Sequence, residues 1–253
     1  MWTLYDELIS GIPGELTVLR AHVGVEWTMI VNSAGGVGLA MTMTESGFPS
    51  QLPETLSGLP LRRAAELVKS WNFCDASFGA AAINSFYNTP EHASALCARF
   101  TPEDPRAQDK QEDAFIAYQP LVAGKRVAVI GHFPYLERRF APICTLSILE
   151  RAPRPGDYPD SACEFILPEQ DFVFITGVTL TNKTLPRLLQ LSRNSHVVLV
   201  GPSTPLSEAM LNAGVNALCG FVAGSEEAVR AAVLREGDSN LFHAGTMVRI
   251  LKP

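Results

Sequence analysis

The chain has few cysteines, few charged residues and no long hydrophobic run, and each shortage excludes a class of protein. Its five cysteines are widely scattered, and no two form a C-x-x-C pair. This spacing excludes a zinc ribbon and a disulfide framework. No window approaches the roughly eighteen apolar residues of a membrane-spanning helix, and the first residues lack the basic and apolar regions of a signal peptide. The sequence therefore indicates a soluble cytoplasmic protein that does not insert into a membrane.

Basic residues are also scarce, since 20 Lys and Arg face 26 Asp and Glu, for a net charge of −6. Proteins that bind nucleic acid or anionic membranes need clustered Lys and Arg, and no such cluster is present. The five histidines are spread along the chain with no metal-ligand spacing between any two. The sequence thus predicts no nucleic-acid partner, and it identifies neither a local metal site nor a cofactor.

The first hundred residues read as an α+β domain. An amphipathic helix is expected over 2–9, and a helix begins after Asp75, which is expected to be its N-cap. Between them come β-like runs, a loop rich in Pro, Ser and Gly, and a further helix. The expected strands are 16–25, 27–31 and 37–43, the loop is 46–60, and the helices are 61–71 and 76–87. An antiparallel meander followed by helices is an α+β arrangement.

From Arg126 onward strands and helices alternate, which predicts a doubly wound, mostly parallel sheet of Rossmann type. The segment 161–168 reads as a helix or a strand. The division predicted is a first domain over 1–100, a linker over 101–124 whose apolar part docks, and a second domain over 125–253. Expected strands are 127–130, 146–149, 172–176, 197–200, 218–222 and an edge strand at 247–251, with helices near 134–143, 161–168, 184–193, 205–213 and 225–235.

The first strand of this second domain, Val127–Ile130, is followed by Gly131, which permits a tight turn, and by Pro134, which is expected at the first helical position. One glycine of the three in a dinucleotide fingerprint is present. Glu137 falls in the first helical turn, where it would already occupy the favourable end of the helix dipole. A standard NAD or FAD site is therefore disfavoured.

Ligands of open α/β sheets bind outside the carboxyl ends of the strands, so the turns that follow the strands are the candidate site. Pro134, Pro186 and Pro205 are expected near helix starts, with Thr184 or Thr204 as caps. Free N–H groups at these starts would favour a ligand that bears a phosphate, carboxylate or enolate. The candidate ligand-binding residues in these turns are Gly131, Glu150, Thr176, Gly177, Thr181, Lys183, Gly201, Ser203 and Thr204.

His132 is the acid–base candidate, because imidazole titrates near neutral pH and this residue directly follows the first strand. The alternative is a hydrogen bond that anchors a loop. Glu150 would hold a hydroxyl or ring N–H, or would be a solvated strand-end carboxylate. Lys183 would neutralise an anion, or would be a surface lysine. Ser203 does not fit a nucleophile elbow, because Pro205 stands where that motif requires glycine.

Many short segments together resemble the putative heavy-metal chelation family over nearly the whole chain. They are 58–62, 68–72, 81–84, 131–134, 146–150, 156–159, 164–169, 183–187 and 200–202. The resemblance implies an enolase N-terminal-like domain before a Rossmann-like domain, with a site shared between them. It also implies that Lys69, Asn72, Asn84 and Tyr87 face this site, unless they are surface or packing groups.

The resemblance further implies condensation or hydrolysis of a flavin-, pterin- or siderophore-like precursor. We therefore expect a small anionic or heteroaromatic ligand between the domains. The alternatives are a non-catalytic protein that binds a metal chelate for a transport system, and a binder of S-adenosylmethionine or a nucleotide. A homo-oligomer remains open.

Overall fold

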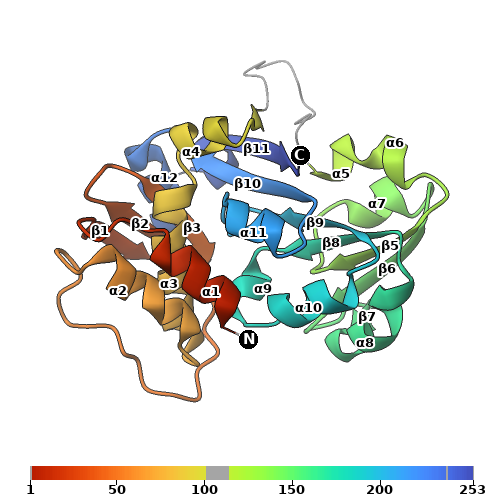
Figure 1. The fold of residues 1–253 in the computed structure, drawn as a ribbon, viewed down its shortest axis with the longest axis horizontal. Helices are drawn as coiled ribbons and strands as arrows, with labels where there is room; N and C mark the ends of the chain where they lie inside the picture. Colours follow the sequence, from red (N-terminus) through yellow and green to blue (C-terminus); the bar gives the residue numbers. More distant parts are fainter. Residues whose placement is uncertain (1, 101–113, 238, 253) are drawn as a thin grey trace.

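The computed structural model describes residues 2–100, 114–237 and 239–252. Two sheets organise them: a three-stranded sheet with order β1-β2-β3 and an eight-stranded sheet with order β4-β11-β10-β9-β8-β5-β6-β7. The smaller sheet lies with α1, α2 and α3 at one side of the molecule, and the larger sheet carries helices on its faces (Figure 1). The predicted α/β class, with an α+β part before a mostly parallel sheet, is confirmed.

The N-terminal part contains the expected antiparallel meander and helices. The meander pairs β1 with β2 and β2 with β3, and α3 packs against β2 and β3. Most residues of α3 are buried, which is typical of a helix covered on all sides. The elements are α1 (Thr3–Ser10), β1 (Val18–Val23), β2 (Trp27–Asn32), β3 (Val37–Met41), α2 (Leu61–Glu66), the 3₁₀ helix η1 (Leu67–Lys69), α3 (Phe73–Tyr87) and α4 (Pro90–Ala95).

The cap of α3 differs from the prediction. Asn72 is the N-cap, and its side chain accepts hydrogen bonds from the backbone N–H groups of Cys74 and Asp75. Asp75 lies in the first turn, fully buried, where it accepts hydrogen bonds from the Ser50 hydroxyl at 2.6 Å and the Gln51 N–H at 2.7 Å. Asn and Asp are both good N-cap residues, and the sequence favoured Asp75. The contacts that decide between the two residues come from a distant loop.

The eight-stranded sheet has six parallel strands in the order β7-β6-β5-β8-β9-β10, the order of a Rossmann fold when β5 is counted first. Two antiparallel strands, β11 and β4, complete it. The strands are β4 (Arg99–Phe100), β5 (Arg126–Ile130), β6 (Thr145–Glu150), β7 (Tyr158–Pro159), β8 (Phe172–Thr176), β9 (His196–Val200), β10 (Ala217–Ala223) and β11 (Gly245–Leu251).

Helices cover both faces of this sheet, because alternate strand residues point to opposite sides. Val127 and Val129 face α5, α6 and α7, whereas Ala128 and Ile130 face α8 to α11. Helix α12 packs between the two sheets. The helices are α5 (Ala114–Ala117), α6 (Gln119–Val122), α7 (Leu136–Phe140), α8 (Cys163–Ile166), α9 (Val178–Thr181), α10 (Leu185–Leu191), α11 (Glu208–Asn212) and α12 (Glu226–Leu234), with the 3₁₀ turns η2 (Asp160–Ala162), η3 (Leu167–Glu169) and η4 (Leu241–His243).

Residues 161–168 are helical, which confirms the helix of the two readings, and a short strand, β7, precedes them. Three local expectations need correction. Pro134 precedes α7, whose N-cap is Tyr135 in a left-handed conformation. Pro205 likewise precedes α11, and Ser207 rather than Thr204 is its cap. The 247–251 strand is not at the edge, because β4 pairs outside β11.

The predicted linker falls partly outside the described residues, which omit 101–113. The part that is described forms α5 and α6, and it buries Phe115, Tyr118 and Val122 against the sheet. The docking of this apolar part is confirmed. Domain borders at 100 and 125 stay a prediction, and β4 at 99–100 already belongs to the larger sheet.

One hydrophobic cluster runs through both parts of the molecule. It joins Tyr5 and Phe78 from the N-terminal part to Ile175, Leu180 and Leu199 from the larger sheet and its helices. The Tyr5 hydroxyl also donates to the Leu180 carbonyl at 2.9 Å. The two sheets are thus held against each other by a shared core.

Within the residues described, no helix has the length and apolar character needed to cross a membrane.

Candidate functional site

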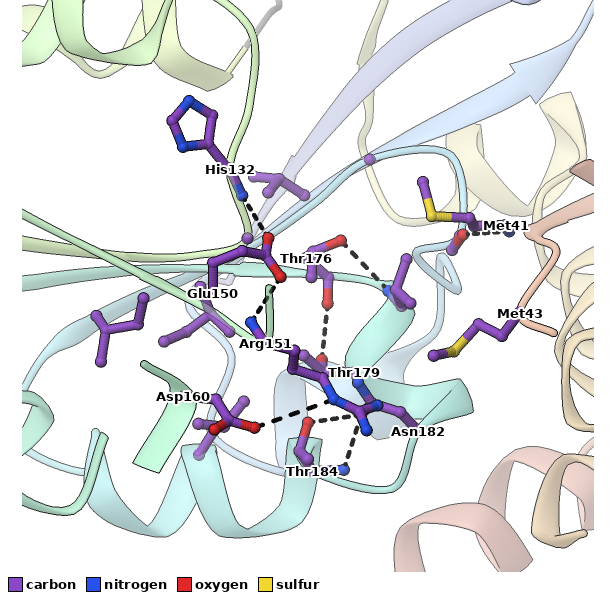
Figure 2. A pocket seen from close by; sticks show the side chains of 18 of the residues that line it. Met41, Met43, His132, Glu150, Arg151, Asp160, Thr176, Thr179, Asn182 and Thr184 are labelled. Carbon is purple, nitrogen blue, oxygen red and sulfur yellow. Dashed lines mark hydrogen bonds and ion pairs between the residues drawn. The ribbon is translucent and has the colours of Figure 1, made fainter. Parts of the chain in front are cut away.

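A cavity of about 1000 Å³ lies at the carboxyl ends of β5, β6, β8 and β9. This is the switch point of the sheet, where the chain order reverses between β5 and β8. Its opposite wall is formed by Trp27 and by residues 41–45 at and beyond the end of β3. Figure 2 shows Met41 and Met43 entering from that wall, across the cavity from Glu150. The site therefore lies between the two sheets.

The structure brings together about half of the predicted residues. Those that line the cavity are Gly131, His132, Glu150, Thr176, Lys183, Gly201 and Ser203. Gly177, Thr181 and Thr204 lie in the same turns but do not line it. Thr181 and Thr204 are buried, and their hydroxyls have no hydrogen-bond partner among the described residues.

The glycines of the strand-end turns serve the backbone. Gly131 and Gly201 have φ values of 102° and 101°, which favour glycine. At Gly177 a Cβ atom would lie 2.7 Å from the carbonyl carbon of Ser203 and the nitrogen of Thr204. The close approach of these two turns requires glycine at position 177, and this accounts for Gly177 without a ligand contact.

The four residues implied by the resemblance in the N-terminal part do not line the cavity. Each is bound elsewhere: Lys69 Nζ lies 2.6 Å from Asp6 Oδ1, the Asn72 side chain caps α3, Asn84 Nδ2 donates to the Leu39 carbonyl at 2.7 Å, and the Tyr87 hydroxyl donates to the Leu8 carbonyl at 3.0 Å. These contacts hold α3 and η1 to their neighbours, as their alternative reading as packing groups expects.

The free N–H groups expected at the helix starts are already bound. Glu150 accepts the backbone N–H of His132 at 2.9 Å and that of Arg151 at 2.7 Å. The N–H of Thr184 donates to Asn182 Oδ1 at 3.1 Å, and that of Thr204 donates to the Gly201 carbonyl at 3.0 Å. These donors are not available to an anion, so the expectation is wrong for the N–H groups of His132, Thr184 and Thr204; that of Arg151 lies between β6 and β7 and not at a helix start.

The His132 ring lies between two carboxylates. Nδ1 is 3.0 Å from Asp157 Oδ2, and Nε2 is 3.1 Å from Glu137 Oε1. Asp157 is buried and also accepts the Arg154 N–H at 3.0 Å, whereas Glu137 is largely exposed. In Figure 2 the ring points away from Thr176 and Met41. His132 therefore anchors the loop after β6, and Nε2 faces the more accessible carboxylate.

The sequence analysis did not select Arg151, which brings a guanidinium to the cavity. Its Nε lies 4.0 Å from Asp160 Oδ2, and its two terminal nitrogens have no hydrogen-bond acceptor among the described residues. Asn182 and Thr184 line the same cavity, and Figure 2 labels them with Arg151. Asn182 Oδ1 accepts the N–H and hydroxyl of Thr184. Asn182 Nδ2 has no acceptor among the described residues and is left as a donor at the cavity.

Lys183 follows Asn182 and adopts a left-handed conformation with φ of 66°. Its Nζ donates to the carbonyl oxygens of Ser70 and Thr181 and lies 4.8 Å from the centroid of the Phe73 ring. Arg151 Cζ lies 6.0 Å from the same ring. Burial lowers the pKa of Lys183 to about 8, because desolvation disfavours the charged amine.

The wall from the N-terminal part was also missed. Met41 and Met43 line the cavity beside Trp27, and the Met41 N–H donates to the Ser203 hydroxyl at 2.9 Å. Cys163 lines the cavity too. Burial, and to a smaller extent the charge of Asp160, raises the pKa of its thiol to about 11. The thiol is therefore protonated at neutral pH and is a weak nucleophile. The walls are adaptable and mostly apolar.

Metal ligation by acidic, histidine or cysteine side chains has little support here. Across residues 2–100, 114–237 and 239–252, no three His, Cys, Asp or Glu side chains lie close enough together to hold an ion. The cavity lining carries the carboxylates of Glu45, Glu150, Asp160 and Glu164, which are not gathered into such a group, beside an arginine, an asparagine amide and two thioethers. Such a set recognises an organic molecule better than a hard cation.

Fold and site together define a two-part α/β protein with a cavity between an antiparallel meander and a Rossmann-type sheet. Two family models match, DUF364 over residues 113–252 and DUF4213 over residues 5–87, and both are described as "Putative heavy-metal chelation". The chain belongs to this family, as the resemblance implied. A comparison with curated proteins finds no match.

Two solved structures are similar over almost their full length. A DUF364-family protein of unknown function from Desulfitobacterium hafniense is 42% identical, with a TM-score of 0.88, and the match covers 100% of this chain and 99% of that chain. A DUF364-family protein of unknown function from Pyrococcus horikoshii is 18% identical, with a TM-score of 0.79 and 98% of each chain covered. The second supports the fold alone.

Proposed function

We propose that the protein binds a small, metal-chelating organic anion in the cavity between its two sheets. The observation that carries the proposal is a cavity of about 1000 Å³ whose mostly apolar lining includes an open guanidinium, that of Arg151. Small-molecule sites have this size and character, with a few polar groups that fix orientation. A bare ion needs far less space, so the metal would arrive already held by its chelator.

Arg151 and Asn182 are the groups we assign to the anionic part of the ligand. A guanidinium with two free terminal nitrogens matches a carboxylate in a bidentate geometry. The Nδ2 of Asn182 would add one donor, while Met41 and Met43 would contact the apolar part. The acidic residue Glu150 would stay with the main chain, where it accepts the N–H groups of His132 and Arg151.

Calorimetry with pyridine-2,6-dicarboxylate, an aromatic chelator with two carboxylates, tests the proposal. The uncharged dicarboxamide of the same ring is the matched ligand. Arg151→Ala should weaken dicarboxylate binding about 30-fold, the equivalent of about 2 kcal/mol for a charge-assisted hydrogen bond. Arg154→Ala is the matched protein control, because Arg154 is exposed in the same loop and does not line the cavity.

Binding of the dicarboxylate that survives Arg151→Ala, or that Arg154→Ala weakens equally, would contradict this assignment. Repeating the titration with the zinc and iron complexes of the chelator tests whether the chelate is the preferred ligand. Metal analysis of untagged protein gives the other arm: stoichiometric metal without any retained organic molecule would favour direct ligation by the protein. Native mass spectrometry of freshly purified protein detects a retained molecule in either case.

Catalysis in the same cavity is the second candidate, and the pairing of His132 with the buried Asp157 favours it. An Asp on Nδ1 fixes the tautomer in which Nε2 accepts a proton, and a substrate could displace the exposed Glu137 from Nε2. We expect His132→Ala to abolish any condensation or hydrolysis of a flavin-, pterin- or siderophore-like precursor. Equal turnover in the variant and the native protein would leave His132 with its loop-anchoring role alone.

Binding of S-adenosylmethionine or a nucleotide has less support, because both oxygens of Glu150 already accept backbone N–H groups. The ribose contact expected of such a ligand would have to share them. Millimolar nucleotide or S-adenosylmethionine should therefore leave the melting temperature unchanged. A concentration-dependent rise would restore this alternative.

A further inference from the structure

We propose that Lys183 is a nucleophilic amine that condenses with an aldehyde or ketone of a carboxylate-bearing ligand to form an imine in the cavity. This covalent activity goes beyond non-covalent binding. It needs the cavity, but it does not need the ligand to be a chelator.

The hydrogen bonds of Lys183 suit a neutral amine. Nζ donates to two acceptors, the carbonyl oxygens of Ser70 and Thr181. An ammonium group has three N–H donors, whereas a neutral amine has two and a lone pair. Two carbonyls therefore satisfy the neutral amine completely and leave the ammonium with an extra donor. Both acceptors are uncharged, so neither holds the proton as a carboxylate would.

Lys69, in η1 of the N-terminal part, provides the contrast. Its Nζ lies 2.6 Å from Asp6 Oδ1 and 2.9 Å from Glu66 Oε2. Partial burial alone would lower the pKa of Lys69, but these hydrogen bonds raise it above its usual value. Lys183 has aromatic neighbours instead, with Nζ 4.8 Å from the Phe73 ring and 5.7 Å from the Trp71 ring.

The surroundings of Lys183 favour reaction rather than a surface role. Its left-handed backbone, with φ of 66°, is uncommon for a residue with a Cβ. Such conformations persist where the surrounding structure enforces them, often at functional sites. The Arg151 guanidinium approaches the same Phe73 ring from the loop after β6. Desolvation of the amine is one device that activates a lysine, and burial is the cause of the lowered pKa of Lys183.

The chemical step is balanced without any redox partner. The Nζ lone pair attacks the carbonyl carbon, the C=O π bond breaks, and a carbinolamine forms. Its hydroxyl then leaves as water, and the two hydrogens of the neutral amine leave with the carbonyl oxygen. The neutral imine that remains has no N–H until it takes up a proton from solvent, and the N–H of the protonated imine can then donate to the carbonyl of Ser70 or Thr181. A carboxylate on the ligand would lie toward Arg151.

The test uses the whole protein, with glyoxylate as the probe and sodium cyanoborohydride to trap the imine. Glyoxylate is the smallest aldehyde that carries a carboxylate. Peptide mass spectrometry then measures labelling at each of the five lysines. With a pKa of about 8, Lys183 has about two-hundredfold more free amine near neutral pH than an ordinary lysine, partly offset by its lower basicity. We expect labelling about tenfold faster than at Lys125 or Lys252.

The pH profile gives a second readout. Labelling of Lys183 should level off above about pH 8, while labelling of ordinary lysines rises toward about pH 10. Lys183→Arg should lose the label, whereas Lys125→Arg, at a lysine outside the cavity, should keep the label at Lys183 and the binding of pyridine-2,6-dicarboxylate, which forms no imine. Equal labelling rates at Lys183 and Lys125 would overturn the imine. If the native protein did not bind the dicarboxylate at all, the proposed function would be overturned instead. The two failures are therefore distinguishable.

Discussion

Polar side chains have different roles in two regions of this molecule: in one they reach a cavity, and in the other they are bound to the backbone. At the carboxyl ends of the parallel strands, Thr176, Lys183 and Ser203 reach a shared cavity. Along η1 and α3, Asn84 and Tyr87 are bound to backbone carbonyls of β3 and α1. In the sheet, topology alone determines where the strand ends meet. In the α+β part, the position of a polar group depends on packing between elements, and many such groups complete those contacts.

The largest effect expected concerns the packing of α3 on β3. At Gly38 a Cβ atom would lie 2.0 Å from the Ser85 nitrogen and 2.2 Å from the Ala81 carbonyl oxygen. Gly38→Ala should therefore destabilise the protein by about 3 kcal/mol or more, because backbone atoms must move to make room. Urea denaturation measures the change.

Gly14→Ala is the matched control, since no atom lies within 4 Å of a Cβ there. Its effect should stay within about 0.5 kcal/mol. A Gly38→Ala variant as stable as the control would show that the α3 contact is looser than the structure has it. The contrast between a packed region and an open cavity would then fail.

The same contrast explains which predictions from the sequence were accurate. The prediction of the doubly wound sheet rests on apolar runs such as Val127–Ile130. Each run is recognised from a few consecutive residues. Their ends then locate Gly131, His132 and Lys183 by the topology of the fold. Asn72 and Tyr87 came from a resemblance that places residues in a segment without fixing where their side chains point. Their contacts depend on partners far away in sequence.

The cavity wall that the sequence missed has the same cause. Met41 and Met43 look like ordinary strand residues, and only the docking of the two sheets brings them to the site. Arg151 directly follows Glu150, but its loop reads as a solvated turn. One signal was available: an arginine just after a strand-end carboxylate, in a sheet whose other strand ends carry polar groups. No periodicity rule gives its orientation.

The next effect concerns the cavity lysine and its pH dependence. The pKa of Lys183 in the folded protein is about 8, below the value of about 10.4 in an unfolded chain. Between these values the unfolded chain binds the extra proton, so stability rises with pH across this window. Below about pH 8 both states are protonated, and the full penalty of burying the charge applies. Since the amine is only half-buried, solvent screening limits the gain to about 1 kcal/mol.

Lys183→Met isolates this contribution, because methionine is of similar length and does not titrate. The stability of the native protein relative to the variant should rise by about 1 kcal/mol between about pH 7 and pH 10. Other groups that titrate in this range are common to both proteins and cancel in the difference. If the free energies of unfolding of the native protein and the variant differ by the same amount at every pH in this window, the lowered pKa is contradicted. The contrast between the two lysines is then weakened.

The smallest effect concerns the lysine of the other region. Lys69 is partly exposed; its ion pair with Asp6 joins η1 to α1, and its ion pair with Glu66 joins η1 to the end of α2. Lys69→Ala should lower the free energy of unfolding by about 0.5 kcal/mol, and about 0.5 M salt should remove most of the difference. Because Lys69 does not line the cavity, its loss should leave the affinity for pyridine-2,6-dicarboxylate unchanged. A tenfold loss of affinity in this variant would return Lys69 to the site and show that the ligand reaches past the β3 wall to η1.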